Sequence, residues 1–506
     1  MSRVTTPDRR ERVHPPGGRG ASPITVPFTA IVLAMLPAVL DQTILATGLP
    51  VIASDLGSLR DVSWVVTTYV VAAAATTPLW GKLGDRHGRK TLLEISLGVF
   101  VVASALCGAA QDITQLIALR LVQGAAAGGL MTLALAAVGD LVSPRERGRY
   151  QGYIAATFAV ATVVGPLLGG VLVEHASWRW FFFVNLPVGL AALAGLSLRL
   201  PSPPPERPER PLDVLGAALL AAATSTLLLT CIWGGARYAW GSSPILVLIA
   251  ATVLLTLALL ARERRAPDPI VPFHLLRSRV VAVASSVLFL AIATLFAITV
   301  FVPLFLQTTA GASPTEAGLV LVPMMLGITV STTVSGRIIA RTGRYKVFPI
   351  AGLALMTAAL ALLAVLAGKP SQVTTGFGLV IFGLGFGMVT QILVIAVQNS
   401  VDRRELGVAT AATGFFRALG GAVGAALLGA VFAAQAGSRA AQGGVEGLDA
   451  AALSGVIDGV RSVFLVAAPL AALALILVLG LPEAPLRTLA SAGDGRAAAG
   501  PTPGDA

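Results

Sequence analysis

Fourteen long apolar runs in a chain of 506 residues constrain its fold more than any other feature. Each run approaches the roughly twenty residues that a helix needs to cross a hydrocarbon core of roughly 30 Å. Because lipid offers no hydrogen-bond partner to a backbone, segments that cross it as single runs must be helical. The composition agrees, with 55% hydrophobic and 12% charged residues and a mean hydropathy of +0.83. The sequence therefore predicts an all-α membrane protein.

The expected spans fall into three groups, which polar or proline-rich links separate. Six spans lie at 26–49, 63–80, 92–110, 113–138, 153–173 and 180–198. Two more lie at 212–233 and 244–260. The last six lie at 281–307, 317–339, 347–366, 376–397, 407–433 and 463–481, and the longest expected outer loop is at 434–458.

This grouping divides the chain into five parts. We expect an N-terminal tail (1–25), a six-helix bundle (26–200), linkers with two additional helices (201–279), a second six-helix bundle (280–482) and a C-terminal tail (483–506). Both tails should be cytoplasmic, because short loops rich in Lys and Arg stay on that side. Of the 36 Lys and Arg residues, the expected outer loops hold only Arg60, Arg179, Arg237, Lys369, Arg439 and Arg461.

Several classes of function are disfavoured by composition. The net charge of +11 reflects topology and contact with anionic lipid rather than a nucleic-acid partner. Cys107 and Cys231 fall inside apolar spans, where we expect them only to pack. The four histidines lie in tails or loops without neighbours at ligand spacing, so we expect no metal, no cofactor and no enzyme activity.

Asp41 is the one carboxylate deep within the expected spans, about 22 Å from the cytoplasmic edge. An ionised carboxylate there must be paired, hydrated or protonated, and intramembrane acids are functional by default. Arg120 lies at matching depth on the fourth span and is its expected partner. The two residues are our candidates for proton coupling. The alternative for Asp41 is a static structural ion pair, and the alternative for Arg120 is hydrogen bonding to backbone carbonyls.

A turn between the second and third spans carries an unusual motif. It reads Gly81-Lys82-Leu83-Gly84-Asp85-Arg86-His87-Gly88-Arg89-Lys90, and its cations fix it to one membrane face. A second copy, Gly336 to Arg344, aligns with it without gaps but has Ala340 in place of Asp85. The two copies indicate an internal repeat of six-helix halves.

Five segments together resemble the major facilitator superfamily, and specifically its fourteen-helix drug:proton antiporter branch. The turn is similar to the cytoplasmic gate motif of the superfamily, and Arg120 to Gly124 to its proton-transfer motif. The run Gly165-Pro166-Leu167-Leu168-Gly169-Gly170 resembles the motif that marks antiport, and the stretches around Asp41 and from Ser177 to Gly189 resemble the fourteen-helix branch.

The resemblance implies the major facilitator fold, with two six-helix bundles and two inserted helices. It implies proton-coupled efflux of amphipathic or lipophilic drugs by alternating access, powered by the proton gradient, in a bacterial cytoplasmic membrane. Gly81, Gly84, Asp85, Arg86, Gly88 and Arg89 would form the gate, and we expect a monomer in contact with lipid. Polar residues of the spans are candidates for lining the substrate cavity: Asp41, Gln42, Gln123, Asn185, Gln307, Gln391 and Arg417.

Three other functions compete with this interpretation. The same fold could take up substrates, or could flip or export a lipid or an endogenous secondary metabolite. A sensor or scaffold without transport would not need the buried charges.

Two roles are equally favoured for Arg417: contact with Asp41 or an anionic substrate, and holding the two halves together. The tenth span lacks an acid, which favours monovalent or neutral substrates over dications.

Overall fold

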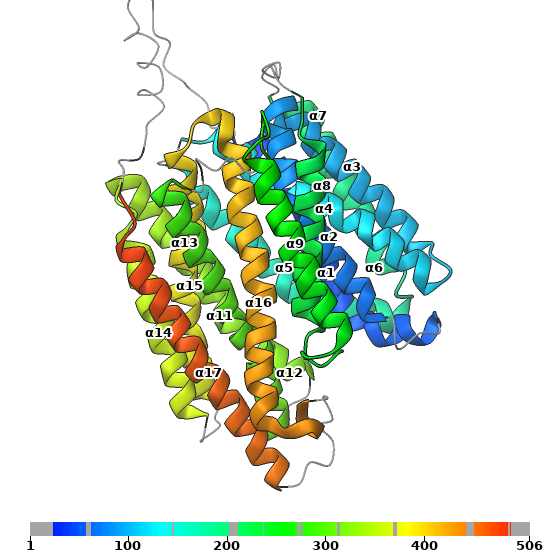
Figure 1. Ribbon diagram of the computed structural model, residues 1–506, viewed down its shortest axis with the longest axis vertical. Helices are drawn as coiled ribbons and strands as arrows, with labels where there is room; N and C mark the ends of the chain where they lie inside the picture. The colour runs from blue at the N-terminus through cyan, green and yellow to red at the C-terminus, as the bar shows by residue number, and fades with distance from the viewer. Residues whose placement is uncertain are drawn as a thin grey trace, which may run out of the picture.

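The computed structural model describes residues 24–56, 62–143, 146–201, 211–235, 237–270, 275, 277–310, 314–367, 372–441, 450–483 and 486. The expected tails lie almost entirely outside these residues. Within the described residues, fourteen helical spans are long and apolar enough to cross a membrane, which confirms the expected number. Figure 1 shows them packed side by side, with the first half of the chain, in blue and cyan, beside the second half in yellow and red.

The helices follow the expected grouping. The first bundle holds α1 (Thr25–Asp55), α2 (Val62–His87), α3 (Arg89–Gly108), α4 (Ile113–Leu141), α5 (Arg147–His175), α6 (Trp180–Phe183) and α7 (Asn185–Arg199). The inserted pair is α8 (Val214–Trp233) and α9 (Ser243–Glu263). The second bundle holds α11 (Arg279–Ala310), α12 (Pro314–Leu319), α13 (Val322–Thr342), α14 (Val347–Leu366), α15 (Gln372–Ser400), α16 (Leu406–Ala441) and α17 (Ala450–Leu479), with a 3-10 turn η1 (Arg403–Glu405) before α16.

Helix ends differ from the prediction at several points. Helix α2 continues through residues 81–87, so most of the motif expected as a turn is helical and only Gly88 separates α2 from α3. The tenth span begins at Val322 and not at 317, because Pro323 occupies the first turn of α13 and a turn separates this helix from α12. Much of the loop expected at 434–458 is helical, since α16 continues to Ala441 and α17 starts at Ala450. This part of the chain is rich in alanine, which favours helix beyond the apolar run. Residues 442–449 lie outside the described residues.

Both copies of the motif place a glycine with positive φ at the same point, although ψ is 130° at Gly88 and −4° at Gly343. Gly88 has φ of 91° and the aligned Gly343 has φ of 72°, a region that favours glycine. Gly88 lets the chain reverse between α2 and α3, and Gly343 ends α13 with its N–H bonded to the Ile339 carbonyl. The internal repeat in the sequence is therefore a repeat in structure.

The two bundles touch closely at the ends that carry these motifs, which we call the motif end. Gly81 of α2 faces α16, where an added Cβ would lie 2.6 Å from the Cβ of Ala411. Its counterpart in the repeat, Gly336 of α13, faces Gly148 of α5. Each copy of the motif thus supplies one glycine that lets a helix of one bundle approach the other bundle. We call these contacts the α2/α16 and α5/α13 interfaces.

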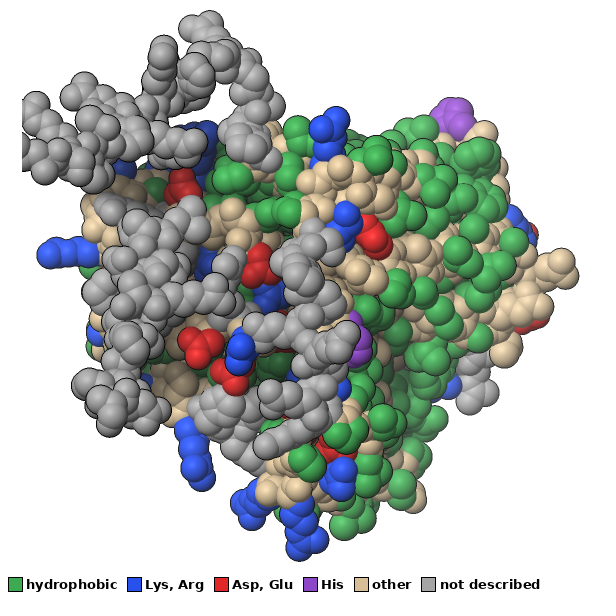
Figure 2. Space-filling model, turned by 90° about the horizontal axis from the view of Figure 1, so that it is seen from above, with side chains coloured by type: hydrophobic (Ala, Val, Ile, Leu, Met, Phe, Trp, Pro, Cys, Tyr) green, Lys and Arg blue, Asp and Glu red, His purple; other side chains and the backbone are tan. Residues whose placement is uncertain are grey.

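The inserted pair packs beside one of these interfaces. Helix α8 contacts both α2 of the first bundle and α16 of the second. Leu228 of α8 is buried against Val71 and Ala74 of α2 and against Leu419 of α16. Figure 2 looks down on the upper end of Figure 1, where charged side chains in blue and red lie on the end face and hydrophobic side chains in green spread over its flank.

Substitution of Gly148 by alanine tests the close contact between the bundles. The new Cβ would lie 2.7 Å from the Cα of Gly336, so the helices must separate. We expect Gly148→Ala to destabilise the purified protein by about 1–3 kcal/mol, as overpacking does, measured from thermal unfolding in detergent. Gly98→Ala is the control, because no atom lies within 4 Å of its added Cβ. Equal stability of both variants would contradict this packing.

Candidate functional site

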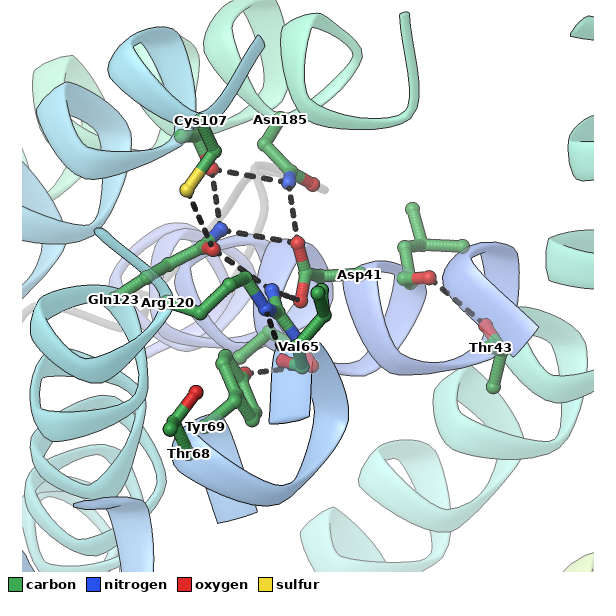
Figure 3. Close-up of polar contacts among 12 residues, drawn as sticks. Asp41, Thr43, Val65, Thr68, Tyr69, Cys107, Arg120, Gln123 and Asn185 are labelled. Atoms are coloured by element: carbon green, nitrogen blue, oxygen red, sulfur yellow. Dashed lines mark hydrogen bonds and ion pairs between the residues drawn. The ribbon is translucent and has the colours of Figure 1, made fainter. Parts of the chain in front are cut away.

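Asp41 lies in the interior of the first bundle and is bound to Arg120. Only 2% of Asp41 and 1% of Arg120 is exposed, and the residues around Asp41 on α1, such as Leu40 and Ile44, are buried and apolar. Nη1 of Arg120 donates to Oδ2 of Asp41 over 2.5 Å, as Figure 3 shows. The structure thus brings together the two charges that the sequence places at matching depth.

The other oxygen of Asp41 is bound by two amides. Nε2 of Gln123 donates to Oδ1 over 3.0 Å, and Nδ2 of Asn185 donates to the same oxygen over 3.3 Å. Both amides also donate to the hydroxyl of Ser104, at 2.7 and 3.2 Å (Figure 3). Helices α1, α3, α4 and α7 therefore converge on one carboxylate. We call Asp41, Ser104, Arg120, Gln123 and Asn185 the buried polar cluster.

Arg120 has partners that do not depend on Asp41. Its Nε donates to the carbonyl of Val65 over 3.0 Å, and its Nη1 also donates to Oε1 of Gln123 over 2.8 Å. The guanidinium lies 4.1 Å from the ring centre of Tyr69, a cation–π contact. Gly124 makes this arrangement possible, because a Cβ there would lie 2.6 Å from the Cα of Tyr69 and hold α4 away from α2.

The glycine-proline motif of α5 packs beside the cluster. Gly165 faces Thr43 of α1, where an added Cβ would lie 2.6 Å from the Cβ of Thr43. The Thr43 hydroxyl donates to the carbonyl of Ala161 over 3.3 Å, one turn before Gly165. Gly169 is buried, whereas Pro166 is exposed and Gly170 has no atom within 4 Å of an added Cβ. Among the four motif residues, Gly165 therefore accounts for the contact with the helix that carries Asp41.

Asp85 of the turn motif links the two bundles. Its two oxygens accept hydrogen bonds from the backbone N–H groups of Gly407 and Val408, each over 2.9 Å, at the start of α16. Arg89 pairs with Asp85 over 2.7 Å and also with Asp140 of α4. A carboxylate at a helix N-terminus is favoured by the helix dipole and by the unpaired N–H groups there. Gly84 lets α2 approach Leu133 of α4.

The link after the inserted pair adds a second acid to the same region. Asp268 pairs with Lys82 and, over 2.8 Å, with Arg86 of α2. Its side chain is 25% exposed, whereas that of Asp85 is 5% exposed. The sequence analysis did not single out Asp268, because nothing in a polar link indicates which distant helix it will meet.

The remaining candidates do not join the buried polar cluster. Gln42 is exposed on α1 and reaches the hydroxyl of Tyr69. Gln307 is half-buried close to the last residue of α11. Gln391 of α15 is buried, and Arg417 of α16 is half-buried.

Sequence reasoning missed one residue of the buried polar cluster, Ser104, and two residues that contact it, Tyr69 and Cys107. Ser104 and Tyr69 are single polar residues in apolar spans, a pattern that is common in helices without a function. Cys107 was expected only to pack, but its Sγ lies 3.6 Å from Oε1 of Gln123 as a weak donor.

A separate cavity of about 270 Å³ lies between the inserted pair and α16. Its walls are almost wholly apolar and include Leu220, Leu259, Phe415 and Phe416, with Glu263 at one end. The Glu263 carboxylate accepts a hydrogen bond from the backbone N–H of Ile270, so it fixes the link after α9.

This architecture matches known transporters. Residues 31–425 match the family model of the Major Facilitator Superfamily. The chain belongs to this superfamily of membrane transporters and is not an enzyme. The fold resembles that of the human organic anion transporter MFSD10, with a TM-score of 0.65, 18% identity and coverage of 90% of this chain and 100% of that chain. It also resembles the proton:xylose symporter XylE, with a TM-score of 0.63, 14% identity and coverage of 92% and 98%.

Curated relatives are also transporters. An uncharacterised MFS-type transporter of Mycobacterium tuberculosis is 40% identical over 435 residues, which are 85% of this chain but only 63% of that protein's length. The multidrug transporter protein MdtP of Bacillus subtilis is 34% identical over 443 residues, 86% of this chain and 82% of its own length. The MFS-type transporter of the acurin A biosynthesis cluster of Aspergillus aculeatus is 34% identical over 424 residues, 82% and 76% of the two chains.

Removal of one member of the Asp41–Arg120 pair should be far more harmful than removal of both. A buried charge without its partner destabilises a protein by about 3–5 kcal/mol, whereas apolar replacement of both can be neutral. We expect Asp41→Leu and Arg120→Met each to lower the stability measured by thermal unfolding in detergent, and the double variant to recover most of the loss. The exposed pair Asp55–Arg179 is the control, with about 0–1 kcal/mol of coupling. Additive losses at Asp41 and Arg120 would contradict a coupled pair.

Asp85→Asn tests the link between the bundles. Asparagine has one acceptor oxygen and cannot accept from both N–H groups of α16 while it pairs with Arg89. We expect a larger population of molecules with separated motif ends, measured as longer distances between spin labels on α2 and α16. Asp112→Asn is the control, because asparagine caps a helix as well as aspartate does. Unchanged distances in Asp85→Asn would show that the charge at this position does not hold the interface.

Proposed function

We propose that this chain exports amphipathic or lipophilic compounds across the bacterial cytoplasmic membrane in exchange for protons. The observation that carries the proposal is the carboxylate of Asp41, buried in an apolar bundle with a permanent cation as its partner. Relatives named as multidrug transporters, MdtP and multidrug resistance protein 3 of Bacillus subtilis, support the direction and the class of cargo. The distribution of Lys and Arg supports a cytoplasmic position for the motif end.

The partners of Asp41 suit a group that gains and loses a proton. Oδ2 is bound only by Arg120, whereas Oδ1 keeps two amide donors, so we assign the proton to Oδ2. When the proton arrives, the ion pair breaks and Arg120 keeps the Val65 carbonyl, Gln123 Oε1 and the Tyr69 ring. Arginine cannot release its own proton, so the charge of Arg120 favours later loss of the proton from Asp41.

A protonated Asp41 needs an acceptor for its new O–H group. Asn185 supplies one, since its Oδ1 is buried and makes no hydrogen bond with the described residues. If the carboxyl group turns so that Oδ2 faces Asn185, rotation of this amide would exchange a donor to the carboxylate for an acceptor of the acid's proton. The cluster can therefore satisfy both states of Asp41, which a purely structural ion pair does not require.

The contacts at the motif end would provide the gate. We assign the described conformation to a state closed toward the cytoplasm, because Asp85 bridges α2 and α16 there and Gly148 meets Gly336 at the second interface. Proton uptake at Asp41 alters contacts among α1, α3, α4 and α7, the helices that move with the gate as one bundle. Rocking of the bundles would then open the motif end and accept the next substrate molecule.

Export of an endogenous compound by the same mechanism is the second candidate. One relative is named as the MFS-type transporter of the acurin A biosynthesis cluster, and this name favours a secondary metabolite as cargo. The apolar cavity between the inserted pair and α16 would also suit an acyl chain, as lipid export or flipping would need.

A vesicle assay tests proton coupling. Inside-out vesicles with an acidic lumen are given ethidium, a monovalent lipophilic cation, and the pH gradient is followed with a fluorescent dye. We expect ethidium to dissipate the gradient with the wild-type protein and not with Asp41→Asn, which cannot exchange a proton. Asp55→Asn is the matched control, because Asp55 lies on the same helix and also pairs with an arginine, but is exposed. Full activity of Asp41→Asn, or a requirement for ATP, would overturn the proposal.

A further inference from the structure

Arg417 is a cation in the middle of the second bundle without a counter-ion. It lies eleven residues after Leu406, the first residue of α16, or about 16 Å into a hydrocarbon core of roughly 30 Å. It makes no hydrogen bond or ion pair with any described residue. Helices α11, α13, α14, α15 and α16 contain no Asp or Glu. A guanidinium at this depth is costly unless it pairs with a negative group, bonds to backbone carbonyls or faces a water-filled cavity.

The contacts of α16 show which way Arg417 points. Gly414, three residues earlier, faces Thr77 of α2, and Gly420, three residues later, packs against Phe289 of α11. Three residues fall about 60° short of a full turn, so Arg417 lies between these two faces. It lies nearer the α11 face, because Gly424, about two turns further on, also packs on α11 at Ala293. Because α2 belongs to the first bundle and α11 to the second, the side chain is directed between the bundles. It is half-buried there, which leaves it accessible to a ligand.

Gln391 lies at the same depth on the neighbouring helix. Nε2 of Gln398 on α15 donates to the hydroxyl of Thr410 on α16 over 3.1 Å, which fixes the register of the two antiparallel helices. Gln391 is seven residues before Gln398, and Arg417 is seven residues after Thr410. Seven residues are nearly two turns, so both side chains lie on the same faces as that contact and about 10 Å further along.

Gln391 is also without a partner. It is 7% exposed, and its Oε1 makes no hydrogen bond with the described residues. A buried amide with an unused acceptor is costly, and such groups occur where a ligand completes the hydrogen bonds. The unused acceptor suits a donor of the ligand, while the amide N–H of Gln391 and the guanidinium of Arg417 offer donors to an anionic oxygen.

Asp41 does not satisfy Arg417. Both of its oxygens are bound within the first bundle, by Arg120 on one side and by Gln123 and Asn185 on the other. Asp41 is therefore not the source of a negative charge for Arg417. A transported molecule that enters between the bundles can supply it.

We propose that Arg417 and Gln391 form a subsite for an anionic oxygen of the transported molecule, so that a carboxylate on a lipophilic body strengthens binding relative to the same body without one. This inference rests on the proposed function, since it names the chemical class of the cargo. It decides between the two roles that the sequence leaves open for Arg417, in favour of contact with an anionic substrate.

Binding of two matched dyes to the purified protein in detergent tests the subsite. The probes are a rhodamine with a free carboxyl group and the methyl ester of the same rhodamine, and the readout is fluorescence anisotropy. We expect the acid to bind wild-type protein more tightly than the ester. Arg417→Gln should weaken binding of the acid by about tenfold or more, the size of a lost charge-assisted hydrogen bond, and leave the ester unchanged.

Two further variants keep the test decisive. Arg417→Lys retains the charge without the planar fork, so we expect it to recover part of the affinity for the acid. Arg199→Gln is the control, because Arg199 is an exposed cation at the end of α7. Unchanged binding of the ester to Arg417→Gln shows that this variant is folded.

The outcomes separate the subsite from the proposed function. Equal binding of the two dyes to wild-type protein, an acid preference that survives Arg417→Gln, or equal weakening of both dyes would each overturn the subsite. The last result would show a structural role for Arg417. A preference for the acid that depends on Arg417, without transport driven by a pH gradient in proteoliposomes, would support the subsite and overturn proton-driven export.

Discussion

The ion pair between Asp41 and Arg120 is the constraint on which the first bundle depends. Two charges in an apolar interior are tolerable only if their remaining hydrogen bonds are satisfied. Three further polar side chains and one backbone carbonyl meet this demand, and they come from α2, α3, α4 and α7. The small residues around the cluster, Gly124 and Gly165, follow from the same need, since they let α2 and α1 come close enough to their neighbours.

Much of this could be predicted from the sequence. Hydropathy alone predicts fourteen spans, and depth along the spans pairs Asp41 with Arg120. Depth does not determine which side of a helix faces which neighbour, so Ser104 and Tyr69 could not be found. The helix ends near Ala441 and Ala450 were missed for another reason. Hydropathy marks where a membrane ends, whereas alanine-rich helix continues into water.

The two halves share a fold and differ in their charges. Gly88 and Gly343 both have positive φ, but Ala340 replaces Asp85, so the acid that caps a helix of the other bundle occurs in one copy. The first bundle neutralises its buried cation internally, whereas Arg417 of the second bundle has no such acid. A repeated scaffold can in this way place a self-contained charge pair in one half and an unmatched charge in the other.

The inserted helices pack beside one of the two interfaces between the bundles, the α2/α16 interface. Helix α8 packs on both α2 and α16, and the link after α9 places Asp268 against Lys82 and Arg86, beside the residues that Asp85 joins. Asp85 is nearly buried and bound to backbone N–H groups, so its loss leaves polar groups unsatisfied. Asp268 is partly exposed, so water can replace its contacts at a smaller cost. We infer that Asp85 contributes more than Asp268 to holding the α2/α16 interface.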